Sequence, residues 1–294
     1  MEFTTLVQVI INGVLLGGVY ALAAFGLSLI FGVSGVLNLA HGEFLMVGGM
    51  AVFLLFDALQ NVWYVNPFIL VAAVAPLFFL VGLVFEKALI QPLTQRKEHV
   101  RLASAVLVTL GAALVIEDVA DFASRGSQYE KSVDFFIPSL VIGEIYLETN
   151  KLVMFGLVLI LIVALFIFLR FTYVGLAVQA VTQNRRGALL VGVNTTRINA
   201  IAFGIGTALA AVAGGFEVIN SMVAPNIGLP LTLKYLCIVV MGGLGSFLGV
   251  ALGGVIIGLG ESFLGFFYPA WSQTVAYLLL VTVLLIRPKG LFGK

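Results

Sequence analysis

Charged residues are scarce in this sequence. Asp, Glu, Lys and Arg together make up 10% of the 294 residues, whereas apolar residues make up 61%. Soluble domains have about a quarter charged residues. With so little charge, the chain lacks the polar surface that would cover a soluble globule. The composition therefore excludes an ordinary soluble domain and predicts an all-α, polytopic transmembrane bundle.

Cysteine and histidine are nearly absent. The chain has one cysteine, Cys237, and two histidines. One cysteine cannot build a disulfide framework, and Cys237 lies in an apolar run, so a buried structural thiol is expected. The same shortage argues against a metal site, and we expect no cofactor.

Sequence motifs for catalysis are also absent. No G-x-x-x-x-G-K-[ST] phosphate loop occurs, so the chain is not expected to bind and hydrolyse ATP by itself. Nor does it contain G-x-S-x-G, H-E-x-x-H or C-x-x-C. Its basic residues lack interleaved aromatic residues, so nucleic-acid binding has no support. An intramembrane enzyme using Glu117 or His41 is the least favoured alternative.

Long apolar runs dominate the sequence instead. A transmembrane helix needs about 20 apolar residues to cross about 30 Å of hydrocarbon. The predicted spans are Val7–Phe31, His41–Asp57, Pro67–Ile90, Leu102–Phe122, Leu152–Arg170, Ile198–Met222, Lys234–Leu264 and Trp271–Ile286. Glycines break the seventh run, which can hold one span or two, so we expect about eight or nine spans in one domain over residues 1–294.

The distribution of charge predicts an orientation, because Lys and Arg concentrate in cytoplasmic loops. Basic residues cluster at 87–101, 170–197 and 287–294. These regions are predicted to be cytoplasmic, and the acidic connection 123–151 extracytoplasmic. Counting back places the N-terminus outside. A cytoplasmic C-terminus then requires the glycine-broken run, Lys234–Leu264, to begin and end on the same side of the membrane, as two spans or a re-entrant pair would.

Two glycine-containing breaks, Gly32–Phe44 and Met241–Gly249, interrupt the apolar runs. Irregular backbone at membrane depth is tolerated only where protein buries it or where it lines a cavity. Paired breaks in the two halves of a chain indicate a transport site. A tight turn at the membrane surface is the alternative for each. The residues that we predict to shape a pathway are Asn38, His41, Glu43, Glu117, Gly242 and Gly243.

Glycines recur at four-residue spacing, as at Gly13 and Gly17 and again at Gly254 and Gly258. Such spacing lets helix backbones approach closely in lipid. We expect close packing within this chain or against a second subunit.

Several other carboxylates lie near the ends of the predicted spans. They are Asp118, Asp121, Glu217 and Glu261. Because charge inside a bilayer is costly, these groups are expected to reach water at the membrane surface or to pair locally.

One segment is too polar to cross a bilayer easily. Residues 172–197 read TYVGLAVQAVTQNRRGALLVGVNTTR, with the small-residue spacing of a short helix. A membrane protein that keeps such a loop presents it to something on one side of the membrane.

Four stretches of the chain carry a family resemblance. They are NLAHGEFLMVGG at 38–49, AVTQNRRGALLVGVNTTRINAIAFGIGTALAAVAGG at 180–215, MGGLGSFLGVALGG at 241–254 and RPKGLFGK at 287–294. This series resembles the permease subunits of branched-chain amino acid ABC importers, in the LivH-like branch that includes urea and amide permeases. The similarity covers essentially the whole chain. It implies an ABC importer permease fold working by alternating access.

The resemblance also implies partners. They are a second, LivM-like permease, two cytoplasmic ATPases and an extracytoplasmic substrate-binding protein, with lipid around the permeases. In that family a cytoplasmic loop forms a short helix that docks on an ATPase. The matching positions are Ala180, Asn184, Ala188 and Gly192. Arg185 and Arg186 are expected to pair with acidic groups of the ATPase, and Gly175 is also expected to belong to the coupling segment. The chain departs from the family at Leu176 and Gln179, where arginines are common, so the contact is expected to depend less on charge.

Two alternatives stay open at this stage. A urea or short-amide permease of the same family would share these motifs. An ion-coupled secondary transporter or channel would work without an ATPase and would use a buried carboxylate such as Glu117.

Overall fold

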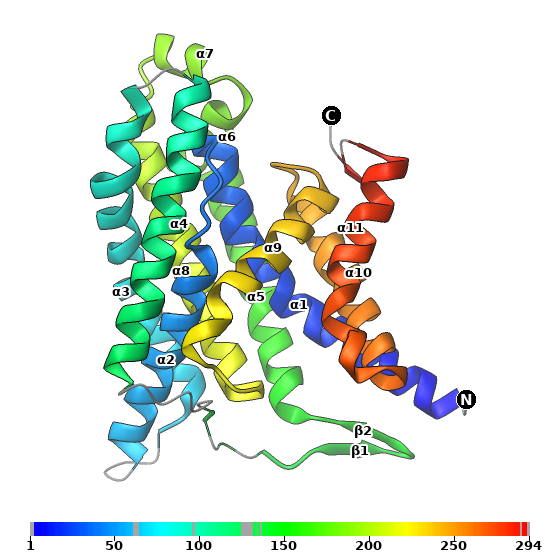
Figure 1. The fold of residues 1–294 in the computed structure, drawn as a ribbon. Helices are drawn as coiled ribbons and strands as arrows, with labels where there is room; N and C mark the ends of the chain where they lie inside the picture. The colour runs from blue at the N-terminus through cyan, green and yellow to red at the C-terminus, as the bar shows by residue number, and fades with distance from the viewer. Residues whose placement is uncertain are drawn as a thin grey trace. The chain divides into compact units, whose positions relative to one another are not determined.

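A computed structural model describes residues 3–60, 65–95, 98–124, 132–133, 135, 137–288 and 290–292. Helices account for nearly all of the elements (Figure 1). The longer ones are α1 Phe3–Ser34, α2 His41–Gln60, α3 Pro67–Phe85, α4 Glu98–Ala123, α5 Thr149–Phe171, α8 Thr195–Asn220, α9 Gly228–Gly242, α10 Phe247–Phe267 and α11 Val275–Ile286. The shorter ones are η1 Glu86–Ile90, η2 Gln91–Gln95, α6 Tyr173–Gln183, α7 Arg185–Leu190, η3 Pro225–Ile227 and η4 Pro269–Thr274. A hairpin joins β1 Leu140–Ile142 to β2 Ile145–Leu147 in antiparallel register.

Nine helical segments within the described ranges are long and apolar enough to cross a bilayer. They are Thr4–Ser34, His41–Gln60, Pro67–Leu93, Val100–Ala123, Thr149–Phe171, Thr195–Asn220, Pro225–Gly242, Phe247–Phe267 and Pro269–Ile286. The prediction of an all-α polytopic bundle is confirmed. The glycine-broken run forms two helices, and the first of them begins earlier than the expected Lys234, at η3.

The chain divides into two compact units. One comprises Met1–Phe25, Asp134–Ile162 and Lys234–Lys294, and is called unit 1. The other comprises Gly26–Val133 and Val163–Leu233, and is called unit 2.

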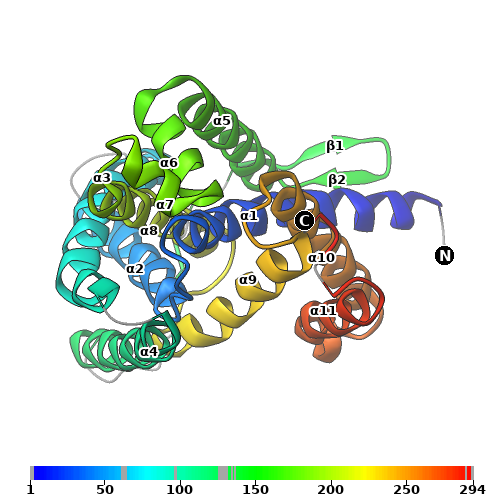
Figure 2. The same ribbon diagram turned by 90° about the horizontal axis from the view of Figure 1, so that it is seen from above.

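Unit 2 is built around α8, which packs against α2 and α3 (Figure 2). Glycines bring these backbones together: a Cβ on Gly82 of α3 would lie 2.7 Å from the carbonyl oxygen of Phe203 on α8. Phe203 and Phe216 are among the largest fully buried side chains. Close backbone approach at small residues is the usual basis of helix packing in membranes.

Unit 1 joins the first part of α1 to α10 through two matched pairs of glycines. A Cβ on Gly13 would lie 3.1 Å from the carbonyl oxygen of Gly258, and one on Gly17 would lie 2.8 Å from that of Gly254. The predicted close packing of these glycines therefore occurs within the chain.

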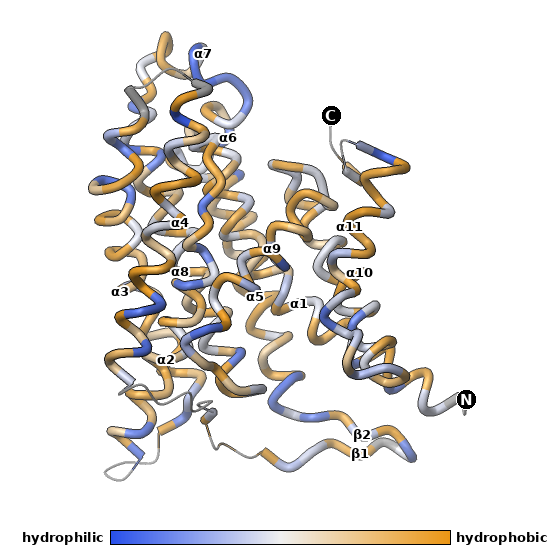
Figure 3. The backbone as a smooth tube through the Cα atoms, viewed as in Figure 1, coloured by the Kyte–Doolittle hydropathy of each residue, from blue (hydrophilic) through white to orange (hydrophobic). Residues whose placement is uncertain are grey.

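The outward surfaces of the long helices are apolar. Ile69 and Val84 of α3 are each 66% exposed, and Leu107 of α4 is 68% exposed. Figure 3 shows apolar residues along the long helices and a hydrophilic stretch around α7. This distribution is the one that contact with lipid requires.

Candidate functional site

The first break, Gly35–Ala40, is an extended stretch of chain inside unit 2. In Figure 1 the chain leaves α1 near the level of α6 and runs back along α4 before α2 begins. Val36 is 1% exposed and packs with Leu93 and Ala105. Since Val36, Asn38 and Ala40 are buried and the residues between them are half-buried, the stretch packs against protein, and a tight surface turn does not describe this break.

Side-chain oxygens accept hydrogen bonds from the backbone N–H groups of this extended stretch. The Ser34 hydroxyl accepts from the backbone N–H of Val36 at 3.1 Å, and the Asn38 carboxamide oxygen accepts from that of Ala40 at 3.2 Å. Thr109 on α4 accepts from the N–H of Leu39 at 3.2 Å. Buried backbone groups need such partners because no water reaches them.

Thr232 in the second turn of α9 connects the break to the start of α2. Its hydroxyl accepts from the backbone N–H of Gly42 at 2.7 Å and lies 3.1 Å from the carbonyl oxygen of Leu39. Thr232 is 1% exposed. This role could not be predicted from the sequence, since a lone threonine in an apolar run is ordinary.

Three of the predicted pathway residues lie together at this break. Asn38 is 1% exposed, and His41 and Glu43 are fully buried. Neither carboxyl oxygen of Glu43 accepts a hydrogen bond from the residues that the structure describes. The carboxyl group lies directly against the Cα of Gly228, where a Cβ would overlap it. Glu117 on α4 is near enough to interact with Glu43 electrostatically.

The second break, in unit 1, has a different construction. Gly243 and Gly245 have φ values of +98° and +81°, which only glycine adopts without strain. Ser246 caps α10 by accepting from the N–H of Gly249 at 3.2 Å. Gly242 packs directly against Gly249. The surface-turn alternative describes this break, and a pathway role for Gly242 and Gly243 stays a prediction.

The C-terminal residues close this turn. The N–H of Leu291 donates to the carbonyl oxygen of Met241 at 2.8 Å, and that of Phe292 donates to Gly242 at 3.2 Å. Carbonyls at the end of α9 would otherwise lack an intrahelical partner.

The polar segment 172–197 forms two short helices, where one was expected. Asn184 separates α6 from α7, with φ −154° and ψ 95°, and its side chain caps α7 by accepting from the N–H of Gly187 at 2.9 Å. Asparagine favours this capping geometry over a position inside a helix. The chain leaves α7 at Gly192, which has a φ of +85°. There the backbone N–H of Gly192 donates to the carbonyl oxygen of Leu189, and that of Val193 donates to the carbonyl oxygen of Ala188.

The small residues of this segment lie mostly inward. Gly175 packs against the backbone of α5 at Leu169, and Gln179 donates to the Leu169 carbonyl oxygen at 2.8 Å. Ala188 is buried, and Ala180 is half-buried. Beside exposed polar residues such as Gln183 and Arg186, the segment also exposes three apolar ones, Leu189, Leu190 and Val191, at 52%, 88% and 79%. A role of the predicted docking residues toward an ATPase stays a prediction.

The two adjacent arginines differ in their surroundings. Partial burial lowers the pKa of the Arg185 guanidinium, the positive charge of Arg101 lowers the pKa further, and Glu86 opposes both effects. A guanidinium remains charged despite such shifts. Arg186 is exposed. Arg185 therefore interacts with the charges of Arg101 and Glu86 in unit 2, whereas the Arg186 side chain is accessible to solvent.

Unit 1 contains a buried ion pair whose two partners could not be predicted from the sequence. Lys234 Nζ lies 3.0 Å from Glu261 Oε1, and the Tyr20 hydroxyl donates to Glu261 Oε2 at 2.6 Å. The Lys234 and Glu261 side chains are 12% and 7% exposed. Glu261 is thus enclosed and paired, which is the second of the two outcomes expected for it. Pairing is what makes two charges tolerable inside the bilayer.

Nine apolar helical segments within the described ranges identify a multi-pass membrane protein. The buried break before one of them carries polar side chains, as transport pathways do. Residues 9–284 match the family described as branched-chain amino acid transport system / permease component. The chain belongs to this family.

Individual relatives agree with that assignment. LivH, the high-affinity branched-chain amino acid transport system permease protein of Escherichia coli (strain K12), is 31% identical, with 100% of this chain and 97% of the relative covered. The corresponding BraD protein of Pseudomonas aeruginosa is 30% identical, with 98% and 95% covered. A solved structure, PsaBC from Streptococcus pneumoniae in complex with Fab, resembles the chain at a TM-score of 0.47 and 12% identity, over 94% of this chain and 89% of that one.

Proposed function

We propose that this chain is a permease subunit of an ATP-binding-cassette importer that moves branched-chain amino acids across the cytoplasmic membrane by alternating access. The observation that carries the proposal is the family match over residues 9–284. Branched-chain amino acids are preferred to urea or short amides because both relatives named above carry that substrate class in their names.

The proposed orientation has a cytoplasmic C-terminus and an extracytoplasmic N-terminus. This orientation agrees with the nine candidate spans of the described residues, since an odd number of crossings leaves the two ends of a chain on opposite sides. Basic residues at 170–197 and 287–294 then face the cytoplasm, as the positive-inside rule expects. The connection 123–151 faces outward in this arrangement.

The segment 172–197 is the proposed contact with an ATPase. An exposed apolar tip of Leu189, Leu190 and Val191, next to the exposed Arg186, supports this role. Such a tip is unfavourable in water and lies in the part of the chain that the charge pattern assigns to the cytoplasm. Burying it against a partner removes apolar surface from water, and Arg186 can pair with an acidic group there.

The proposed assembly contains a second, LivM-like permease, two ATPases and an extracytoplasmic substrate-binding protein. The ATPases hydrolyse ATP, and the coupling segments transmit their closure to the permeases. This chain contributes no covalent chemistry in that scheme.

Leu190→Asp in the full complex tests the contact. A buried carboxylate without a partner is costly, so the ATPases are expected to be lost when the permease is purified through a tag. Leu244→Asp is the matched control, because Leu244 is also an exposed leucine, at 48% exposure, but lies in the second break and outside the segment 172–197. Equal retention of the ATPases by both variants would overturn the contact, and full uptake by the chain alone in vesicles without ATP would favour an ion-coupled transporter.

A further inference from the structure

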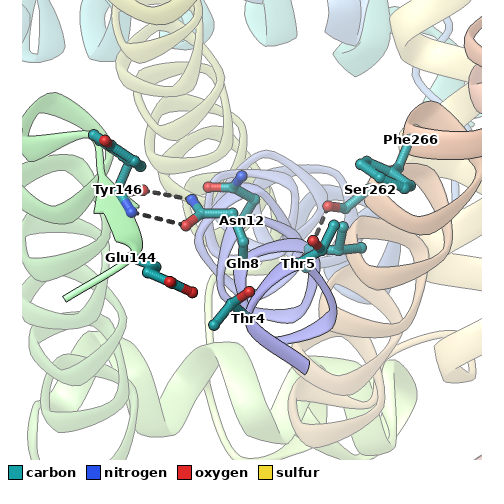
Figure 4. Close-up of a pocket in the computed structure, with 9 residues that line it drawn as sticks. Thr4, Thr5, Gln8, Asn12, Glu144, Tyr146, Ser262 and Phe266 are labelled. Carbon is teal, nitrogen blue, oxygen red and sulfur yellow. Dashed lines mark hydrogen bonds between the residues drawn. The ribbon is translucent and has the colours of Figure 1, made fainter. Parts of the chain in front are cut away.

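A pocket of about 660 Å³ with a mixed polar and apolar lining lies in unit 1, between α1, the β1–β2 hairpin and α10 (Figure 4). Its volume falls within the range of about 300–1,000 Å³ that small-molecule sites occupy. Figure 4 shows the hairpin on one side of α1 and α10 on the other. The pathway residues predicted from the sequence are all elsewhere.

The polar side chains around this pocket divide into two kinds. The first kind holds the walls together. Gln8 on α1 donates to the carbonyl oxygen of Tyr146 and accepts from its N–H at 3.0 Å. Ser262 on α10 donates to the carbonyl oxygen of Val9 at 2.8 Å. These bonds fix both the hairpin and α10 to α1.

The second kind has no partner within the described ranges. The hydroxyls of Thr4 and Thr5, the carboxamide of Asn12 and the carboxylate of Glu144 line the same pocket and bond to no other described side chain or backbone group. Thr4, Thr5 and Asn12 are half-buried and Glu144 is exposed, so these groups can be reached by a solute. Four such groups line the pocket together with two apolar residues, Val9 and Phe266.

The chemistry of the lining matches a free amino acid. Glu144 is the charged residue of the lining and would pair with an ammonium group. The Asn12 amide and the threonine hydroxyls can donate to a carboxylate. Val9 and Phe266 supply an apolar wall for an aliphatic side chain.

We propose that this pocket binds the zwitterionic end of a branched-chain amino acid on its way into the transporter. The inference rests on the proposed function, which puts the hairpin on the extracytoplasmic side, where a binding protein would release its cargo. A contact surface for the binding protein itself is the competing use of the same residues.

The test uses the assembled transporter with its ATPases and binding protein in proteoliposomes. Glu144→Gln is expected to raise the KM for L-leucine by about tenfold or more, since loss of a charge-assisted bond worth about 1.4 kcal/mol is tenfold in affinity. Glu148→Gln is the matched control: Glu148 is a carboxylate on the same connection that pairs with Lys151 at 2.8 Å and does not line the pocket. The control is expected to transport normally.

A second measurement reads binding directly. The single native cysteine, Cys237, is buried, so a cysteine introduced as Asn12→Cys can be labelled selectively with a water-soluble thiol reagent. L-Leucine is expected to slow this labelling several-fold, and to leave labelling of Leu140→Cys on the exposed part of the hairpin unchanged.

The outcomes separate the two proposals. If the unaltered complex takes up no L-leucine with ATP, the proposed function fails. If the complex does take up L-leucine, but leucine does not slow the labelling of Asn12→Cys and uptake does not depend on Glu144, only the pocket proposal fails. Weaker capture of the binding protein by Glu144→Gln, with no protection by leucine, would also overturn the pocket and identify a protein contact.

Discussion

The two breaks in this chain look alike as sequence and differ as structure. Each is a glycine-containing interruption that leads directly into an apolar helix. The first becomes an extended, buried stretch whose backbone is held by Thr109 and Thr232, 70 and 190 residues away. The second becomes a tight turn made by Gly243 and Gly245.

The difference lies in which residues accompany the glycines. At the first break the backbone leaves the helix inside the protein, where hydroxyl and carboxamide side chains make the hydrogen bonds that water would otherwise make. Around the second, positive φ values reverse the chain within a few residues, and Leu244 stays 48% exposed. Only the first break therefore places polar side chains inside the membrane domain, which makes it the stronger candidate for a transport role.

The largest expected effect comes from Gly42→Val at the first break. A Cβ there would lie 2.6 Å from the Thr232 hydroxyl oxygen and 2.7 Å from the Thr232 backbone nitrogen. Backbone atoms cannot move aside cheaply, so the cost should reach or exceed the roughly 1–3 kcal/mol of ordinary overpacking. We expect little monodisperse protein by size-exclusion chromatography.

Gly111→Val is the control for that variant. Gly111 is also helical, but a Cβ there meets no atom within 4 Å. Normal yield for both variants would mean that the first break is loosely packed.

Thr232→Val should have the next largest effect. Valine keeps the shape and removes the hydroxyl, so the N–H of Gly42 stays buried without its acceptor, at a cost of about 1–3 kcal/mol. The unfolding temperature in detergent is expected to fall. Thr282→Val, at an exposed threonine that bonds within its own helix at 2.8 Å, should leave this temperature unchanged. Equal shifts would remove the special role of Thr232.

Ser246→Ala should weaken the second break only moderately. The loss of the cap on α10 costs about 1 kcal/mol. Because this turn is structural in our account, L-leucine uptake by the complex should persist, and Ser246→Thr should restore the unfolding temperature. A complete loss of uptake with an intact fold would show that the second break also belongs to the pathway.

Glu43→Gln should have the smallest effect on stability. The carboxyl group accepts no hydrogen bond from the described residues, so its replacement breaks no bond, and the change should stay within about 1 kcal/mol. Uptake should nevertheless fall several-fold if the first break lines the pathway. Asp118→Asn, at an exposed carboxylate on α4, serves as the comparison. Unchanged uptake in both would exclude Glu43 from the pathway.

The broad fold could be predicted because it depends on local properties. Run length predicts the spans, and the glycine pairs at Gly13–Gly17 and Gly254–Gly258 predict a close helix contact. Both properties can be counted in the sequence. The polar segment 172–197 was also recognisable, since its composition contrasts with its neighbours.

The remaining features depend on residues that meet only after folding. Lys234 and Glu261 are 27 residues apart, and nothing in the sequence around either residue predicts that the two form an ion pair. The division of the polar segment at Asn184 reflects a competition between helix continuation and capping that spacing alone does not resolve. The pocket in unit 1 requires the hairpin to fold back on α1 through Gln8.

The most direct test of the central claim is uptake of radiolabelled L-leucine into proteoliposomes that contain this chain with its partner permease, ATPases and binding protein. We expect accumulation that requires ATP at the cytoplasmic side, is abolished by Leu190→Asp and persists with Leu244→Asp. Uptake that proceeds at the full rate without ATP, or that is equal in the two variants, would contradict the central claim.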